Sequence, residues 1–340
     1  MRLSVLDQSV ALAGRPQGAS IRETIELAQY CEALGYHRFW VSEHHNHDTI
    51  TGTAPEVVMA AIGATTNRIR IGSAGVMLPH YSALKVAEQF RVLDAIAPGR
   101  IDLGLGRAPG SDGRTAYALN PHASQGADNF PEQIRDLMAW VSGDPLPENH
   151  AFAAIRAFPQ GETIPVTWML GTSNYGAQVA AHFGIPYCFA HFITQGEGCG
   201  QALDIYRQQY QPSPRHPEPT TTICVWALMA DTEEEAEFQF MSRARTRLAR
   251  DRGILTPIEA PEIAASHPYS APEQARIKAM RDEAFVGTPE TVGNRLRDLA
   301  EQHELDELVI LTWTHELAAR KHSYDLFARE FDIESTEERR

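Results

Sequence analysis

The stretch Leu3-Ser4-Val5-Leu6-Asp7-Gln8-Ser9-Val10 decides between the two common ways of arranging alternating strands and helices. An apolar, β-rich segment ends at Leu6 and is followed directly by polar residues, with Gly14 alone nearby. An open, doubly wound sheet normally carries a glycine-rich phosphate loop after its first strand. Because that loop is absent from this sequence, the stretch favours a closed barrel of parallel strands.

Eight β-rich segments alternate with helical segments along the chain, which is the pattern of a parallel sheet with helical crossovers. The expected strands are Leu3–Leu6, Phe39–Ser42, Ile69–Met77, Ile101–Leu105, Val166–Leu170, Tyr187–Ala190, Ile223–Met229 and Glu307–Thr312. Eight strands suit one closed barrel, so the expected class is α/β, a TIM (β/α)₈ barrel with insertions.

Local signals predict where several helices begin and end. Ser20-x-x-Glu23 has the pattern of a capping box, and Gly35 has that of a C-terminal stop. Thr288-Pro289-Glu290 combines an N-cap, a proline at the first helical position and an acid at the positive end of the helix dipole.

Two segments, at about 109–165 and 230–305, are longer than barrel loops need to be. A further strand follows each of them, which indicates insertions within a single domain of residues 1–333. The second segment includes a helix, 231–252, that is acidic at its start and basic at its end. Residues 334–340 are expected to form a charged tail.

Composition argues against several classes of protein. With 43% hydrophobic and 22% charged residues, the 340-residue chain is typical of a soluble globular protein. No apolar run approaches the roughly 20 residues that cross a bilayer, and no leader is apparent, so we expect a cytoplasmic protein with no membrane partner. The formal net charge of -14 argues against a nucleic-acid partner. The four cysteines are scattered and predict neither a disulfide framework nor a thiolate metal site.

The expected second strand ends in Glu43-His44-His45-Asn46-His47, and chemistry in such barrels lies at the C-terminal ends of the strands. A histidine exchanges protons near neutral pH, and an adjacent acid fixes its tautomer. The alternatives are a metal site and a solvated polar loop. A zinc motif would have H-E-x-x-H spacing on a helix, so no metal is expected here.

Two further strand ends point to an anionic ligand. Arg107 follows the fourth expected strand, and Gly171, Thr172 and Ser173 follow the fifth and precede a helix. Amides at a helix start with hydroxyls beside them bind anions, and an arginine forms charge-assisted bonds to phosphate. A structural ion pair and a plain N-cap are the alternatives, but the position of both groups at adjacent strand ends favours a phosphate site.

Residues at two other strand ends could form the surface for a flat ring in the same region. Small residues in Gly72–Gly75 leave room for a flat ring against the backbone, although close packing against a neighbouring strand explains them equally well. After the sixth strand, Phe189–Phe192 offers aromatic and imidazole surface, and core packing would account for its two phenylalanines.

Together these segments resemble the flavin-utilising, luciferase-like monooxygenase family. The residues that carry the resemblance are Leu3–Asp7, Ala33–Trp40, Glu43–Asn46, Gly75–Pro79, Pro98–Arg107 and Val286–Val292. Their order spans nearly the whole chain, which makes the combination specific for the family and weakly informative about the substrate.

The resemblance implies that reduced flavin mononucleotide (FMN) binds across the barrel mouth. Its ring would lie against Ala74, Gly75, Val76 and His191, and its phosphate near Arg107, Gly171, Thr172 and Ser173. In relatives the peptide that matches Ala74–Gly75 is a non-proline cis bond. The family's catalytic histidine matches His44, which would serve proton transfer with Glu43 or His45 as an orienting neighbour.

The resemblance also implies an oxidoreductase that uses reduced FMN and dioxygen to insert one oxygen atom into a small organic substrate. A separate reductase would supply the reduced flavin. Related barrels commonly pair through the helices after the second and third strands, which implies a homodimer using parts of Pro55–Thr66 and Ala83–Ala95.

Two other functions remain open. One is a hydride-transfer oxidoreductase that uses a deazaflavin, as some relatives do, and the other is a non-catalytic flavin-binding protein on the same barrel. The chain departs from the family pattern at Ala190, where relatives often have a second histidine, and at Thr172, where they often have a serine. The threonine keeps its hydroxyl, so phosphate binding is still expected.

Overall fold

Eight parallel strands close into a barrel in the order β10-β1-β2-β3-β5-β6-β7-β8, because β10 also pairs with β8. The structure, a computed structural model, describes residues 1–108 and 111–333, so the expected tail 334–340 lies outside the described residues. The strands are β1 (Arg2–Asp7), β2 (Arg38–Val41), β3 (Arg70–Ser73), β4 (Val76–Met77), β5 (Ile101–Gly106), β6 (Val166–Gly171), β7 (Tyr187–Phe189), β8 (Thr221–Met229), β9 (Phe285–Gly287) and β10 (Glu307–Leu311). The prediction of a TIM barrel is confirmed.

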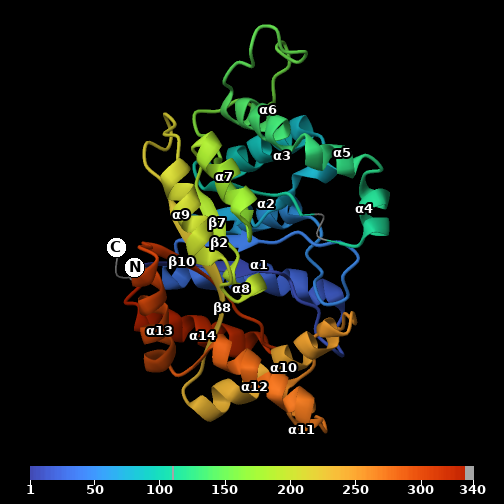
Figure 1. Ribbon diagram of the computed structural model, residues 1–340, viewed down its shortest axis with the longest axis vertical. Helices are drawn as coiled ribbons and strands as arrows, with labels where there is room; N and C mark the ends of the chain where they lie inside the picture. Colours follow the sequence, from blue (N-terminus) through green and yellow to red (C-terminus); the bar gives the residue numbers. More distant parts are fainter. Residues whose placement is uncertain (109–110, 334–340) are drawn as a thin grey trace.

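Helices surround this barrel, and Figure 1 places α6 and α10–α12 toward opposite ends of the long axis. The helices are α1 (Gln17–Leu34), α2 (Pro55–Thr65), α3 (Ala83–Ile96), α4 (Gly113–Leu119), α5 (Ala123–Asp128), α6 (Phe130–Ser142), α7 (Asn174–Phe183), α8 (His191–Thr194), α9 (Cys199–Gln209), α10 (Glu233–Asp251), α11 (Pro261–Ser266), α12 (Ala271–Glu283), α13 (Pro289–Gln302) and α14 (Leu317–Glu330), with a 3₁₀ turn η1 (Leu78–His80). No helix within the described residues combines the length and apolar character that a membrane crossing demands.

Most of the predicted helix ends are confirmed, and one is wrong. Gly35 ends α1 in the left-handed region with φ 94°, and the Thr288 side chain accepts a hydrogen bond from the amide of Thr291 at the start of α13. Ser20 and Glu23, however, lie inside α1, because this helix begins three residues before Ser20. Glu23 instead pairs with arginines outside the helix start.

The expected third strand is divided into β3 and β4, and the Ala74–Gly75 peptide bond between them is cis, as the resemblance implied. Gly72 packs against a neighbouring strand, since an added Cβ would lie 2.5 Å from the Trp40 ring. At Gly75 an added Cβ would lie 2.8 Å from the Gly104 carbonyl oxygen. Close packing between strands therefore requires both glycines.

The two long segments of the sequence hold different structures. The first contains α4, α5 and α6. The second contains α10 to α13 and an unpredicted strand, β9, whose Phe285 pairs with Ala227 at the end of β8. Because β9 extends β8 beyond the barrel, it anchors this segment beside the C-terminal ends of the strands.

A buried ionic network fills the N-terminal end of the barrel. Asp102 on β5 binds Arg38 at 2.8 Å and Arg70 at 2.6 Å, and it also accepts a hydrogen bond from the Trp40 indole at 3.0 Å. Arg38 donates its second bond, at 2.8 Å, to Glu307 on β10. Burial alone would raise the pKa of Asp102, but Arg38 and Arg70 outweigh that effect and hold the pKa below its usual value. Every charge in this network has a partner of opposite sign.

Candidate active site

A cavity of about 740 Å³ opens at the C-terminal ends of the strands. Of the residues predicted for the site, those that line it are His44, Ala74, Gly75, Arg107, Gly171, Thr172 and Ser173. Drug-sized ligands occupy cavities of roughly 300–1,000 Å³, so the space suits a ligand of substantial size. Seven of the nine predicted site residues are therefore brought together at one barrel mouth.

Val76 and His191 do not line this cavity among its described walls. Val76 is buried in the core, where it pairs with Leu105 on β5. His191 begins α8 directly after β7, and its ring lies 5.9 Å from the ring of Phe285, beside a second, much smaller cavity. The helix start turns the imidazole away from the mouth, and Ala190 and Phe192 line the main cavity in its place.

The ends of β5 and β6 meet at one corner of the cavity, which we call the Arg107 corner and define as Arg107, Thr172, Ser173 and Tyr175. The guanidinium of Arg107 lies 4.1 Å from the centre of the Tyr175 ring, in the first turn of α7. Ser173 is the N-cap of α7, and its hydroxyl makes no capping hydrogen bond. The first amides of a helix have no acceptor within the helix, so this corner presents N–H groups, hydroxyls and one cation.

His44 follows β2 and lies partly buried in the wall of the cavity. Its Nδ1 atom is 3.3 Å from the Ser42 hydroxyl, and its ring centre is 5.7 Å from that of His47. Burial lowers the pKa of His44 to about 3, and the neighbouring His47 and Arg250 contribute to the same shift. The imidazole is therefore neutral at physiological pH.

Glu43 does not contact His44, which corrects the expectation that it orients this histidine. Its carboxylate is buried and accepts hydrogen bonds from the amide of Met77 at 3.0 Å and the Tyr81 hydroxyl at 2.5 Å. It also lies 2.7 Å from Nε2 of His45. Glu43 thus ties the loop after β2 to the loop after β4, and Ser42 is the group that contacts His44.

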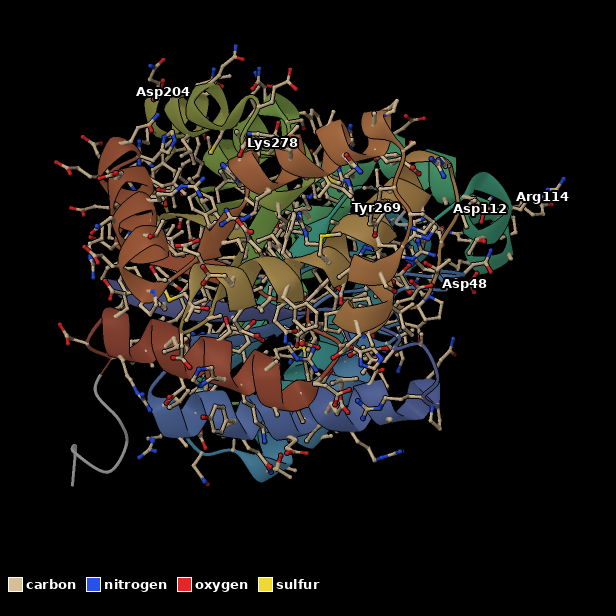
Figure 2. The ribbon with its side chains drawn as sticks, turned by 90° about the horizontal axis from the view of Figure 1, so that it is seen from below. Asp48, Asp112, Arg114, Asp204, Tyr269 and Lys278 are labelled. Atoms are coloured by element: carbon tan, nitrogen blue, oxygen red, sulfur yellow. The ribbon has the colours of Figure 1, made fainter. Side chains whose placement is uncertain are left out.

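The rim of the cavity includes a bridge between the loop after β2 and α4. The side-chain amide of Asn46 donates a hydrogen bond of 3.2 Å to Asp112, the N-cap of α4. Figure 2 places Asp112 and Asp48 at the same edge of the molecule, which agrees with this contact. Hydrogen bonds from Thr115, Asn46 and the Arg114 amide hold the pKa of Asp112 below its usual range. The first long segment therefore reaches the cavity.

A second cationic region was not predicted from the sequence. We call it the α10 face and define it as three arginines and one threonine: Arg243, Thr246, Arg247 and Arg250. All four residues line the cavity. Their spacing of three, one and three residues places them on one side of an α-helix. This spacing is visible in the sequence, but the sequence does not indicate that this side of the helix faces the barrel mouth.

Apolar and aromatic side chains complete the lining. Trp40 and Trp168 pack edge to face beneath the cavity, with ring centres 5.2 Å apart. Trp226, Trp313 and Phe192 line the wall nearer α10. Within the described residues, no group of three histidine, cysteine or acidic side chains is arranged to hold a metal ion. The site thus combines two cationic regions, a neutral imidazole and an apolar floor.

Comparisons with known proteins agree with this architecture. The model of the luciferase-like monooxygenase family matches residues 1–303. The protein YwcH of Bacillus subtilis (strain 168) is 43% identical over 330 residues, covering 97% of this chain and 98% of YwcH. The N-acetyl-S-alkylcysteine monooxygenase of the same organism is 36% identical over 329 residues, covering 96% and 97% of the two chains.

A solved structure, that of apo-MsnO8, superimposes with a TM-score of 0.89 at 32% sequence identity. The match covers 98% of this chain and 99% of MsnO8. A family match over most of the chain, joined by relatives above 30% identity along nearly their full lengths, shows the family. The chain belongs to the luciferase-like monooxygenases.

Proposed function

We propose that this protein is an FMN-dependent monooxygenase that uses reduced FMN and dioxygen to oxidise a small organic substrate. The observation that carries the proposal is the Arg107 corner, which lies in the same cavity as a neutral, partly buried His44. An anion-binding corner, a proton acceptor and an apolar floor are the three features that such a reaction requires.

The residues present fit a flavin. Arg107, the hydroxyls of Thr172 and Ser173 and the first amides of α7 would hold the phosphate by charge-assisted hydrogen bonds. The backbone at Ala74 and Gly75 lines the cavity and offers a flat surface to a ring. We do not place the ring against Val76 or His191, because neither lies in the described lining of this cavity.

The bound flavin would provide the redox chemistry with dioxygen. The side chains around it would orient the reactants and exclude water. His44 would accept and return a proton through its ring, with the Ser42 hydroxyl fixing the orientation of the imidazole. The aromatic wall formed by Trp226 and Trp313 would keep the cavity dry. We infer that a separate reductase delivers the reduced flavin.

Paired variants test this proposal. Arg107→Ala should weaken reduced FMN binding by roughly 10- to 100-fold, the loss expected for charge-assisted bonds of about 1.5–3 kcal/mol. His44→Asn should bind FMN as wild type does and slow substrate oxidation by about 10²–10⁴-fold. Anaerobic calorimetric titration gives the affinities, and screening of organic substrates gives a turnover assay.

Three results would contradict the proposal. Unchanged FMN affinity in Arg107→Ala would remove this residue from the phosphate site, and wild-type turnover in His44→Asn would reject its catalytic role. A parallel titration with a deazaflavin separates the two cofactors, since tight deazaflavin binding without FMN binding would favour hydride transfer instead.

We also infer a homodimer through α2 and α3. These helices expose Val57, Val92 and Ile96, whose relative exposures are 65%, 47% and 43%. Exposed apolar side chains on neighbouring helices are suited to an interface between subunits. Sedimentation of Val92→Glu would test this inference, and a dimer of unchanged stability would contradict it.

A further inference from the structure

The α10 face gives the cavity a charge opposite to that of the whole chain. The chain has a formal charge of -14, yet the described residues of the lining include four arginines and two carboxylates. The arginines are Arg107, Arg243, Arg247 and Arg250, and the carboxylates are Glu43 and Asp112. Both carboxylates are already engaged, Glu43 by Met77, Tyr81 and His45, and Asp112 by α4 and Asn46.

Arginines on the two sides of α10 differ in how their charge is balanced. Arg245, which faces away from the cavity, forms an ion pair with Glu259. Within residues 1–108 and 111–333, Arg243 and Arg250 have no carboxylate at ion-pair distance. Arg247 approaches Asp251 at 3.7 Å, and its buried Nε atom has no hydrogen-bond partner among the described residues. Two of the three cavity-facing guanidiniums on this helix therefore have no ion pair among the described residues, and the third has a long one.

Burial makes this lack of partners costly. Arg243 packs its guanidinium 4.1 Å from the centre of the Trp226 ring. Burial lowers its pKa to about 9, the neighbouring Arg247 contributes to the same shift, and Glu283, beyond ion-pair distance, only partly offsets it. A desolvated charge without a partner is expensive, so such a group is retained where a ligand of opposite charge completes it.

The α10 face is separate from the Arg107 corner. The Arg107 corner is formed by the ends of β5 and β6, whereas α10 follows β8, and β7 lies between β6 and β8 in the barrel. Arg250 lies close enough to His44 and His47 to lower the pKa of both. A molecule held by the α10 face would therefore lie beside the imidazole that we assign to proton transfer.

From these observations we infer that the α10 face binds the carboxylate of the organic substrate, an inference that rests on the proposed function. Arg243 and Arg247 would form charge-assisted bonds with the two carboxylate oxygens. The indoles of Trp226 and Trp313 would contact an apolar body. The substrate class is thus a small carboxylic acid with an apolar group, held with that group toward His44.

Calorimetric titration of the protein saturated with FMN tests this inference. The probes are 3-phenylpropionate and its neutral amide, which share the apolar body and differ in charge. Wild type should bind the carboxylate at least tenfold more tightly than the amide, and Arg243→Met and Arg247→Met should each remove that preference. Arg245→Met is the matched control, because it removes an arginine from the same helix without touching the cavity, and it should leave the preference intact.

The outcomes separate this inference from the proposed function. Equal binding of the two probes by wild type, no binding of the carboxylate, or unchanged preference in both α10 variants would overturn the carboxylate site. A loss of FMN affinity in Arg243→Met or Arg247→Met but not in Arg107→Ala would also overturn it, because the α10 face would then hold the flavin phosphate. Loss of FMN binding in Arg107→Ala alone supports the proposed function, whatever the probes do.

Discussion

Two regions of the molecule treat charge in opposite ways, the N-terminal end of the barrel and the α10 face. At the N-terminal end, Arg38, Arg70, Asp102 and Glu307 contact one another directly, and each cation has a carboxylate within 2.8 Å. At the α10 face, the described partners of the cavity-facing arginines include no carboxylate closer than the 3.7 Å contact of Arg247 with Asp251. Both regions belong to the same chain, so the difference in charge pairing reflects what each region does.

Completed ion pairs at the N-terminal end of the barrel and incomplete ones at the α10 face indicate a division between stability and binding. Charges that satisfy each other fix the register of neighbouring strands and leave nothing for a ligand. Charges held apart from counter-ions remain available to an anion. They also lower the free energy of unfolding of the chain. Substitutions in the two regions should therefore differ in the size, and even in the sign, of their effect on the free energy of unfolding.

The largest effect is expected at the N-terminal end. Asp102→Asn leaves Arg38 and Arg70 buried without their shared counter-charge, so the free energy of unfolding should fall by about 3–5 kcal/mol. Asp144→Asn is the control, because Asp144 and Arg215 form an exposed pair that should contribute about 1 kcal/mol or less. Urea denaturation measures both changes, and losses of equal size would contradict the distinction.

An intermediate effect should appear in the pH dependence of stability. The pKa of His44 is about 3 in the folded chain and about 6.5 in an unfolded one, so the unfolded state binds the extra proton between these values. The free energy of unfolding should therefore fall as pH decreases from about 6.5 toward 3, with this residue contributing a slope of at most about 1.4 kcal/mol per pH unit.

His44→Asn removes that contribution and should flatten the stability curve over the same range. Ser42, His45, His47 and Arg250 stay in place, so the difference between the two curves reports on His44 itself. Urea denaturation from pH 7.5 to pH 4 measures it. Parallel curves would mean that the imidazole is not shielded from solvent as described.

The smallest effect, and the one with the opposite sign, is expected at the α10 face. Arg243→Met removes a half-buried guanidinium that has no ion pair among the described residues and keeps an apolar contact with Trp226. Stability should stay within about 1 kcal/mol of wild type or rise, since no counter-ion is left unpaired. Arg38→Met provides the contrast, because it leaves the buried Glu307 without an ion pair and Asp102 with Arg70 alone. A similar loss in both variants would show that Arg243 is structural.

The sequence predicts those parts of the site that follow from strand periodicity. Arg107 and Ser173 follow adjacent strands of a parallel barrel, and parallel strands bring their C-terminal ends together whatever the helices do. The prediction that both would lie at one mouth needed no knowledge of side-chain direction. The position of His44 after β2 was predictable for the same reason.

The expectations that differ from the structure concern side-chain directions, which the periodicity of the sequence does not define. His191 follows β7, but α8 begins at that residue and turns its imidazole toward Phe285. Glu43 is next to His44 in sequence, yet both lie in the loop after β2, where the two side chains contact different neighbours. The spacing of Arg243, Arg247 and Arg250 defines one side of a helix, but the path of the chain after β8 decides what that side faces.

A crystal structure of the protein soaked with FMN tests the central claim most directly. We expect phosphate density within hydrogen-bond distance of the Arg107 guanidinium and the Ser173 hydroxyl, with the α10 face left free of the flavin. Phosphate density beside Arg243 and Arg247, or flavin bound outside the cavity, would contradict the assignment of the two cationic regions.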